Sequence, residues 1–399
     1  MAAAVPCKEL QVLNGFNNYI GVVRAHTNFS VELLDQCKEE ICHAIWGETN
    51  PDISGIGVCI GYAIELAVGF LLAAFMMFIR QRQGRKWEFL QIVNKKGLEA
   101  YFEFAIYFAV AIELATIIML VNKDFGISTA DFGANEAQNA LAIAVMCIIP
   151  LVYPIALLPA RIFHPESTRQ HLADRKAEDN ERRHKFRLIM FSLVIVLFFY
   201  PFLSQCIHNW AELRVGQAAG GGTEGVVLIT GEEYERVKNM CFGDIDRFTD
   251  AEHWLLAICE IIASLLLFLF TLWYAMGAGL QRWEEGEKFS GKEHQATKVL
   301  SRTHEKLQRG WHGHRGMLLF LPITFGSCLL WCIFRLRRMQ ASAAEHMGNG
   351  YEGNNWGFGQ IVGIIIFAPV VVDMGFAAWS ARSLLGWGDY DALSSRESF

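Results

Sequence analysis

Apolar residues along this chain are gathered into seven long runs that are separated by polar stretches. A helix needs about 20 mostly apolar residues to cross about 30 Å of hydrocarbon, and each run meets that requirement. Helices are expected because a backbone in lipid must satisfy its own hydrogen bonds. The pattern predicts an all-α membrane protein, a seven-transmembrane-helix bundle with spans at about 55–79, 103–121, 139–160, 187–207, 254–278, 317–335 and 357–381.

The polar stretches leave no room for a separate soluble domain of ordinary size. We expect an N-terminal tail at 1–54, a membrane domain at 55–381 and a C-terminal tail at 382–399. Charges of both signs and helix-forming residues fill 161–186 and 280–316, which predicts solvated helical extensions. The loop 208–253 contains a triple glycine and a β-prone run from Val226 to Thr230, which predicts a loosely ordered cap.

Composition and charge agree with a membrane protein. Hydrophobic residues make up 53% of the 399 residues and charged residues only 19%. The formal net charge of −6 is small and mixed in sign, so a nucleic-acid partner is not expected. Residues 1–48 contain no apolar segment typical of a signal peptide, so the first span is expected to act as the translocation signal.

The distribution of lysine and arginine predicts the direction of the bundle. Of the 35 basic residues, 24 lie on the side that holds the loops after spans one, three and five and the C-terminal tail. Because the basic side is normally cytosolic, the N-terminus is predicted outside or lumenal and the C-terminus in the cytosol. The exception is a cluster after span six (Arg335, Arg337 and Arg338), which we interpret as a helix end with snorkelling side chains.

Two further features fit this direction. Asn28-Phe29-Ser30 is a glycosylation sequon in the tail that is predicted to be outside. Four cysteines fall on the same side, where oxidation to a disulfide occurs, and they allow three pairings that the sequence does not distinguish: Cys37, Cys42, Cys206 and Cys241.

Four acidic residues lie inside predicted spans. They are Glu65, Glu113, Glu260 and Asp373, and no Lys, Arg or His occupies the centre of any span. A charged group at such a depth costs at least about 2.5–3.5 kcal/mol, so these side chains are expected to face the protein interior. Three roles stay open. The acids are structural hydrogen-bonding groups, or they bind a cationic or protonatable ligand, or they supply a proton in acid chemistry.

Other motifs carry less chemistry. The glycines of Gly55-Ile-Gly57-Val-Cys-Ile-Gly61 do not have dinucleotide-binding spacing and predict close helix packing. Five prolines lie within spans, and we expect kinks there that open a central cavity (Pro150, Pro154, Pro201, Pro322 and Pro369). We predict no metal site and no cofactor, because the three histidines of the 280–316 loop lack the cysteine partners of a zinc motif.

Two segments resemble a known group. Cys37-x4-Cys42 followed by Trp46-Gly47 and the run from Asn50 to Val58 resembles the start of span one in filamentous-fungal seven-span membrane proteins. The segment Asn355-Trp356-Gly-Phe358-Gly359-Gln360-Ile361 is similar to the start of their last span. Some members are encoded beside genes of specialised metabolism, including terpenoid pathways. The resemblance implies a multi-pass protein of the endoplasmic reticulum or plasma membrane.

The leading functional prediction is a protein that handles a small lipophilic molecule in an acid-lined cavity, as a membrane cyclase of a terpenoid pathway does. Glu65 or Glu113 would then donate the initiating proton, and Glu260 or Asp373 would accept one. Whether the chain is an enzyme is left open. One alternative is a receptor or sensor whose extracytosolic cap binds a ligand and whose basic loops contact a cytosolic protein. The other is a proton-coupled transporter with relay sites at Asp373 and Glu113.

Overall fold

The computed structural model describes twelve stretches of the chain. They are 36–38, 55–80, 82–122, 134–158, 170–210, 239–240, 243, 245, 248–290, 315–346, 352–354 and 356–384. The regular structure within these stretches is entirely helical, without a strand. Seven of the helices are long and apolar enough to cross a membrane, which confirms the predicted seven-helix architecture.

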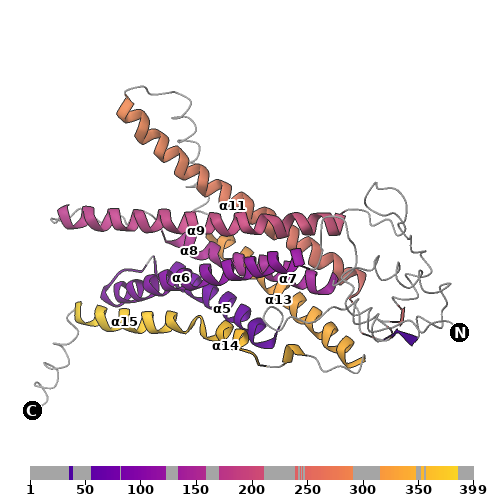
Figure 1. Ribbon diagram of the computed structural model, residues 1–399. Helices are drawn as coiled ribbons and strands as arrows, with labels where there is room; N and C mark the ends of the chain where they lie inside the picture. The colour runs from indigo at the N-terminus through magenta and orange to yellow at the C-terminus, as the bar shows by residue number, and fades with distance from the viewer. Residues whose placement is uncertain are drawn as a thin grey trace, which may run out of the picture.

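The seven crossings form one elongated bundle (Figure 1). The first six are α5 (Ile56–Ile79), α6 (Arg85–Asn122), α7 (Ala134–Ile148), α9 (Gln170–Trp210), α11 (Asp250–Ser290) and α13 (Arg315–His346). The seventh consists of two pieces, α14 (Phe358–Ile365) and α15 (Ala368–Leu384). Helices α9 and α11 continue beyond their apolar runs into the polar stretches, as the charge pattern predicts.

Helix α7 lies at the centre of the bundle. Its apolar window is 94% buried, whereas the windows of the other six crossings are 22–50% buried. Every residue from Ala140 to Ile149 is buried, so the helix has no side that faces outward. A helix that is apolar all round must be enclosed by other helices, and α7 packs against α5, α6, α9, α11 and α13.

The central crossing is interrupted near its middle. After Ile148 the chain forms a 3-10 turn, η2 (Ile149–Leu151), and then a short helix, α8 (Val152–Leu157). Proline has no N–H group and its ring clashes with the preceding turn, so Pro150 ends the regular α-helix. The N–H of Val152 bonds to the carbonyl groups of Ile149 and Pro150, which satisfies the polar backbone at the break.

The first and last crossings are joined by glycines. A Cβ atom on Gly61 of α5 would lie 2.5 Å from the carbonyl oxygen of Gly363 on α14, so these two backbones touch. The N–H of Gly57, in the first turn of α5, donates to Oε1 of Gln360 over 3.0 Å. This bond satisfies a helix N-terminus that has no capping side chain of its own. The predicted packing through small residues is confirmed.

Two of the three arginines at the end of span six have hydrogen-bond partners in the structure. Helix α13 continues past them to His346, and Nε of Arg335 donates to Oε1 of Glu252 at the start of α11 over 3.2 Å. The guanidinium group of Arg337 donates to the carbonyl oxygen of Gly353 and to the side chain of Asn354. Local carbonyl and carboxylate groups therefore stabilise two of the three charges, which accounts for the exception to the charge bias.

Helices α11 and α13 meet through cysteines. The Sγ atoms of Cys259 and Cys328 are 3.0 Å apart, and the Cys332 thiol lies beside Cys328. All three are free thiols. The contact fixes the register of α11 against α13 in the middle of the bundle.

The glycine contact between α5 and α14 gives a first prediction. Gly61→Val places two methyl groups against the Gly363 backbone, which has no side chain to move away. We expect a loss of about 1–3 kcal/mol of stability, measured by thermal unfolding of the purified protein in detergent. The matched control is Gly375→Val on α15, where an added Cβ meets nothing within 4 Å. Equal destabilisation by the two variants would contradict the α5–α14 contact.

The cysteine contact gives a second prediction. Mild oxidation with iodine is expected to link Cys259 to Cys328, because the two sulfur atoms already lie within 3.0 Å of each other. Mass spectrometry of proteolytic fragments should detect the joined α11 and α13 peptides. Cys328→Ser should abolish this product, and Cys206→Ser, which removes another free thiol on α9, should leave it unchanged. A product that persists in Cys328→Ser would show that the register of the two helices differs from the one described.

Candidate functional site

Glu65 lies at the centre of the bundle and is fully buried. Its helix is fixed by Tyr101 of α6, whose hydroxyl group donates to the main-chain carbonyl of Glu65 over 3.1 Å. The Tyr101 ring also packs closely against Gly69, where a Cβ would come within 2.6 Å of the hydroxyl oxygen. This arrangement leaves the Glu65 side chain on the side of α5 that packs against α7.

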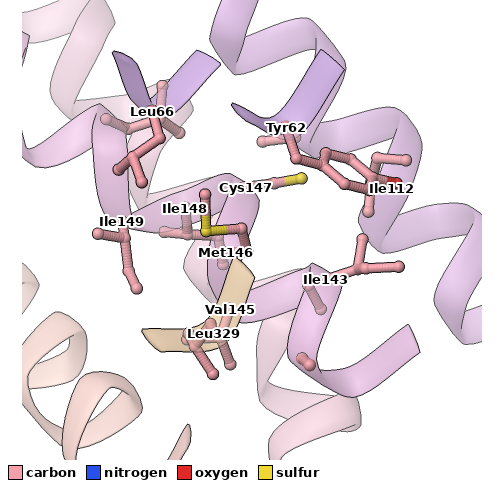
Figure 2. Close-up of a cluster of buried hydrophobic side chains, with 14 of the residues drawn as sticks. Tyr62, Leu66, Ile112, Ile143, Val145, Met146, Cys147, Ile148, Ile149 and Leu329 are labelled. Atoms are coloured by element: carbon pink, nitrogen blue, oxygen red, sulfur yellow. The ribbon is translucent and has the colours of Figure 1, made fainter. Parts of the chain in front are cut away.

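The side-chain group that faces the Glu65 carboxyl is the thiol of Cys147 on α7. A thiol is only a weak donor, and neither Glu65 oxygen has a conventional hydrogen-bond partner. Around the thiol lies a cluster of buried apolar side chains that includes Leu66, Ile112 and Leu329, and the Cys147 sulfur points toward the ring of Tyr62 (Figure 2). Glu65 and Tyr62 are therefore neighbours of the same cysteine.

Glu113 of α6 approaches the same cysteine from a second helix. It is also fully buried, lies within electrostatic range of Cys147, and has no hydrogen-bond partner on either oxygen. Within the described part of the chain, neither Glu65 nor Glu113 forms an ion pair. Both acids therefore lie on helices that pack against α7, Glu65 with its carboxyl group at the Cys147 thiol and Glu113 within electrostatic range of that thiol.

Further buried polar groups without partners lie on α6 and α7. Thr116 is one turn beyond Glu113, and Asn139 is two turns from Cys147 toward the start of α7. Both side chains are almost completely buried, and neither the threonine hydroxyl nor the asparagine amide makes a hydrogen bond. Buried side-chain atoms without a partner also occur on other helices, at Ser204 of α9 and Gln340 of α13, so they do not by themselves mark α6 and α7 as a site.

Glu260 belongs to a different part of the bundle. It is fully buried on α11, and its charge acts on the thiols of Cys259 and Cys332 at the contact with α13. Its main-chain carbonyl accepts a hydrogen bond from the hydroxyl group of Ser264 over 2.6 Å. No described contact joins Glu260 to Glu65 or Glu113.

Asp373 does not face the interior. Its side chain is exposed on α15, as are its neighbours Val372 and Phe376. The prediction that it points inward with the other acids is wrong, because the buried side of α15 is formed by Val370, Ala377 and Ala381. Asp373 cannot act as a relay partner of Glu113 across the interior described.

The four cysteines predicted as disulfide candidates differ in their bonding. Cys37 is buried and disulfide-bonded, and its partner lies outside the described residues. Cys206 is a free thiol, so its inclusion among the disulfide candidates is wrong, and none of the three complete pairings of the four cysteines is formed. Cys42, Cys241, the sequon at Asn28 and the Val226–Thr230 run all lie outside the described residues.

The described residues contain no group of three or more histidine, cysteine or acidic side chains arranged to hold a metal ion. The histidines of the 280–316 loop lie outside them. What the arrangement of Glu65, Glu113 and Cys147 can do is bind and release protons, because each group has one titratable proton and no fixed cation competes for it.

Sequence reasoning identified Glu65 and Glu113 by their depth in apolar runs but missed Cys147. A single cysteine in an apolar helix reads as a small hydrophobic residue. The available signal was its position three residues before Pro150, where the sequence already predicts a break in the helix.

No family model matches this sequence, and neither a curated protein nor a solved structure shows significant similarity to it.

Proposed function

We propose that this chain is a proton-coupled transporter that exchanges protons for a small lipophilic molecule carrying a positive charge. The observation that supports the proposal is the burial of two acids that have no hydrogen-bond partner, Glu65 at the thiol of Cys147 and Glu113 within electrostatic range of it, near the break in the enclosed central helix. Discontinuous helices near the middle of the membrane are a common feature of transporter binding sites.

The exchange follows from charge balance. Two carboxyl groups without a cation are compatible with an apolar interior when they carry protons. When one of them releases its proton, a molecule with one positive charge must take the place of that proton, because an uncompensated charge at that depth is costly. Protons and substrate therefore occupy the site in turn. The broken segment α7–η2–α8 is the element that would rearrange between the two states.

Acid-initiated chemistry is supported less well. Glu260 and Asp373 do not join the acid pair, so the predicted proton acceptor lacks a place in the same site. A described cavity of about 270 Å³ lies elsewhere, between α6 and α9.

We also propose the orientation with the N-terminus outside and the C-terminus in the cytosol. The bias of 24 among 35 basic residues supports it. The anchoring of Arg335 and Arg337 by neighbouring oxygen atoms supports it as well, since these residues are the exception to the bias.

Membership in the filamentous-fungal group, and residence in the endoplasmic reticulum or plasma membrane, remain proposals. They rest on two segments, one at the start of α5 and one at the start of α14. These segments are about 300 positions apart in the chain, yet they pack on each other through Gly57 and Gln360. A shared contact is a physical reason for both segments to be retained together.

The transport proposal predicts the behaviour of proteoliposomes that contain the purified protein. An imposed pH gradient should drive uptake of a lipophilic cation such as ethidium by the wild type. Glu65→Gln and Glu113→Gln should each abolish gradient-driven uptake, because a glutamine cannot release a proton. Uptake is measured by the quenching of ethidium fluorescence or by filtration.

Glu88→Gln is the matched control, since it removes an exposed carboxylate from the same helix as Glu113. It should transport like the wild type. Equal uptake by all four proteins would refute the proposal. So would wild-type uptake that is the same with and without the imposed pH gradient. A changed metabolite profile in cells expressing the wild type but not Glu65→Gln would favour acid chemistry instead.

The orientation is tested by glycosylation in a eukaryotic host. Asn28 should carry an N-linked glycan, so the wild type should shift in electrophoretic mobility after endoglycosidase treatment and Asn28→Gln should not. A sequon appended after Phe399 serves as the control and should stay unmodified. Modification of the appended sequon in place of Asn28 would reverse the proposed orientation.

A further inference from the structure

A cluster of charges lies between α6 and α9. Its centre is Glu99, whose side chain is only 8% exposed. Nζ of Lys96 donates to Oε2 of Glu99 over 2.9 Å, and three further cations lie farther from this carboxylate: Lys95 at 3.7 Å, Arg187 at 3.7 Å and Arg183 at 3.9 Å. Only the lysine at 2.9 Å is within ordinary hydrogen-bond distance.

The cluster has more positive than negative charge. Four cations surround Glu99, and the only other acid described as acting on them is Glu103, which acts on Arg187. Arg183 is the cation farthest from Glu99 and its side chain is 60% exposed, so its guanidinium group has donors available for a second anion. An exposed arginine at the edge of a membrane span favours an anionic ligand.

A cavity of about 270 Å³ lies directly beside these charges. Two arginines, Arg183 and Arg187, and two acids, Glu99 and Glu103, line one part of it. Its inner wall is apolar and consists of Phe102 and Ile106, each 1% exposed.

The outer margin of the same cavity is apolar but open. Tyr107 is 58% exposed and Phe186 is 51% exposed, and both line the cavity. Large apolar side chains that are exposed on a membrane-spanning bundle face lipid, so the cavity opens sideways toward the bilayer. A water-soluble anion would make no favourable contact with these apolar side chains, whereas an acyl chain can pack along them.

The cavity lies where the polar and apolar parts of both helices meet. The apolar run of α6 begins near residue 103, and that of α9 begins near residue 187. Glu99 and Arg183 lie on the polar side of these points, and Ile106 and Tyr107 lie on the apolar side, so the cavity spans the depth at which a phospholipid headgroup joins its acyl chains. Both arginines belong to the side that the charge bias assigns to the cytosol, where anionic lipids are concentrated.

We propose that the α6–α9 cavity binds an anionic phospholipid, with its phosphate on Arg183 and Arg187 and an acyl chain along Phe102, Ile106, Tyr107 and Phe186. Arg183 is suited to the phosphate because its side chain is 60% exposed and 3.9 Å from Glu99, which leaves donors of its planar fork available for a second anion. The bound lipid would bridge α6 to α9 and thereby stabilise the bundle. This inference does not depend on the proposed transport activity.

Thermal unfolding of the full-length protein in detergent tests the proposal. Added phosphatidylinositol should raise the melting temperature of the wild type by several degrees, whereas phosphatidylcholine should have little effect. Arg183→Gln should lose most of the increase. It should still fold, because three cations remain around Glu99.

The matched control is Arg182→Gln, which removes the same charge from the neighbouring position on α9 without altering the cavity lining. It should keep the full response to phosphatidylinositol. Equal loss in the two variants would show a general charge effect and overturn the proposal. Phe186→Ala should weaken the response to the lipid through the apolar wall.

Inorganic phosphate distinguishes a lipid from a free anion. It should not reproduce the stabilisation at the same concentration of phosphate groups, because it lacks the acyl chain. Equal stabilisation by inorganic phosphate, or by phosphatidylcholine, would overturn the assignment to an anionic lipid. Native mass spectrometry should show phosphatidylinositol retained on the wild type and on Arg182→Gln but depleted on Arg183→Gln.

Discussion

The bundle is organised around one helix, α7, in which every residue from Ala140 to Ile149 is buried. Lipid would cover an apolar helix as well as protein does, so this enclosure depends on close packing by other helices. Five helices pack against α7, and the crossing is 94% buried. Because the backbone of such a helix has no access to water, its break at Pro150 must be satisfied locally. The N–H of Val152 provides that by bonding to two carbonyl groups in the preceding turn.

The ring of helices around α7 is closed where α13 packs against α5, and the last crossing packs closely on α5 and α6. Glycines allow this, because Gly61 and Gly363 bring α5 and α14 into backbone contact. Gln360 then completes the hydrogen bonding of the first turn of α5 through Gly57. On the other side of α5, the bond from Tyr101 to the Glu65 carbonyl holds the helix against α6. The position of Glu65 beside α7 is thus a consequence of packing at residues that carry no chemistry themselves.

The buried acids at the centre of the bundle and the one at its polar edge have opposite electrostatic surroundings. In the centre, Glu65 and Glu113 have only the weak donor Cys147 between them, and neither has an ion-pair partner in the described part of the chain. At the polar edge of the same helix α6, Glu99 is surrounded by four cations. A single long helix, α6, therefore carries a buried acid without an ion-pair partner among the described residues at its centre and a charge cluster at its edge.

The sequence by itself determined the number of crossings, the helical class and the small-residue contact of α5, because apolar run length and glycine spacing are local properties. It also identified Glu65 and Glu113, since an acid within an apolar run is conspicuous. It did not determine which helix is central, that Asp373 faces outward, or that Glu260 lies apart beside the cysteines of α11 and α13. Those features depend on which side of each helix its neighbours cover. The helices are apolar on nearly all sides, so their sequences do not mark a buried face, and only the tertiary packing decides it.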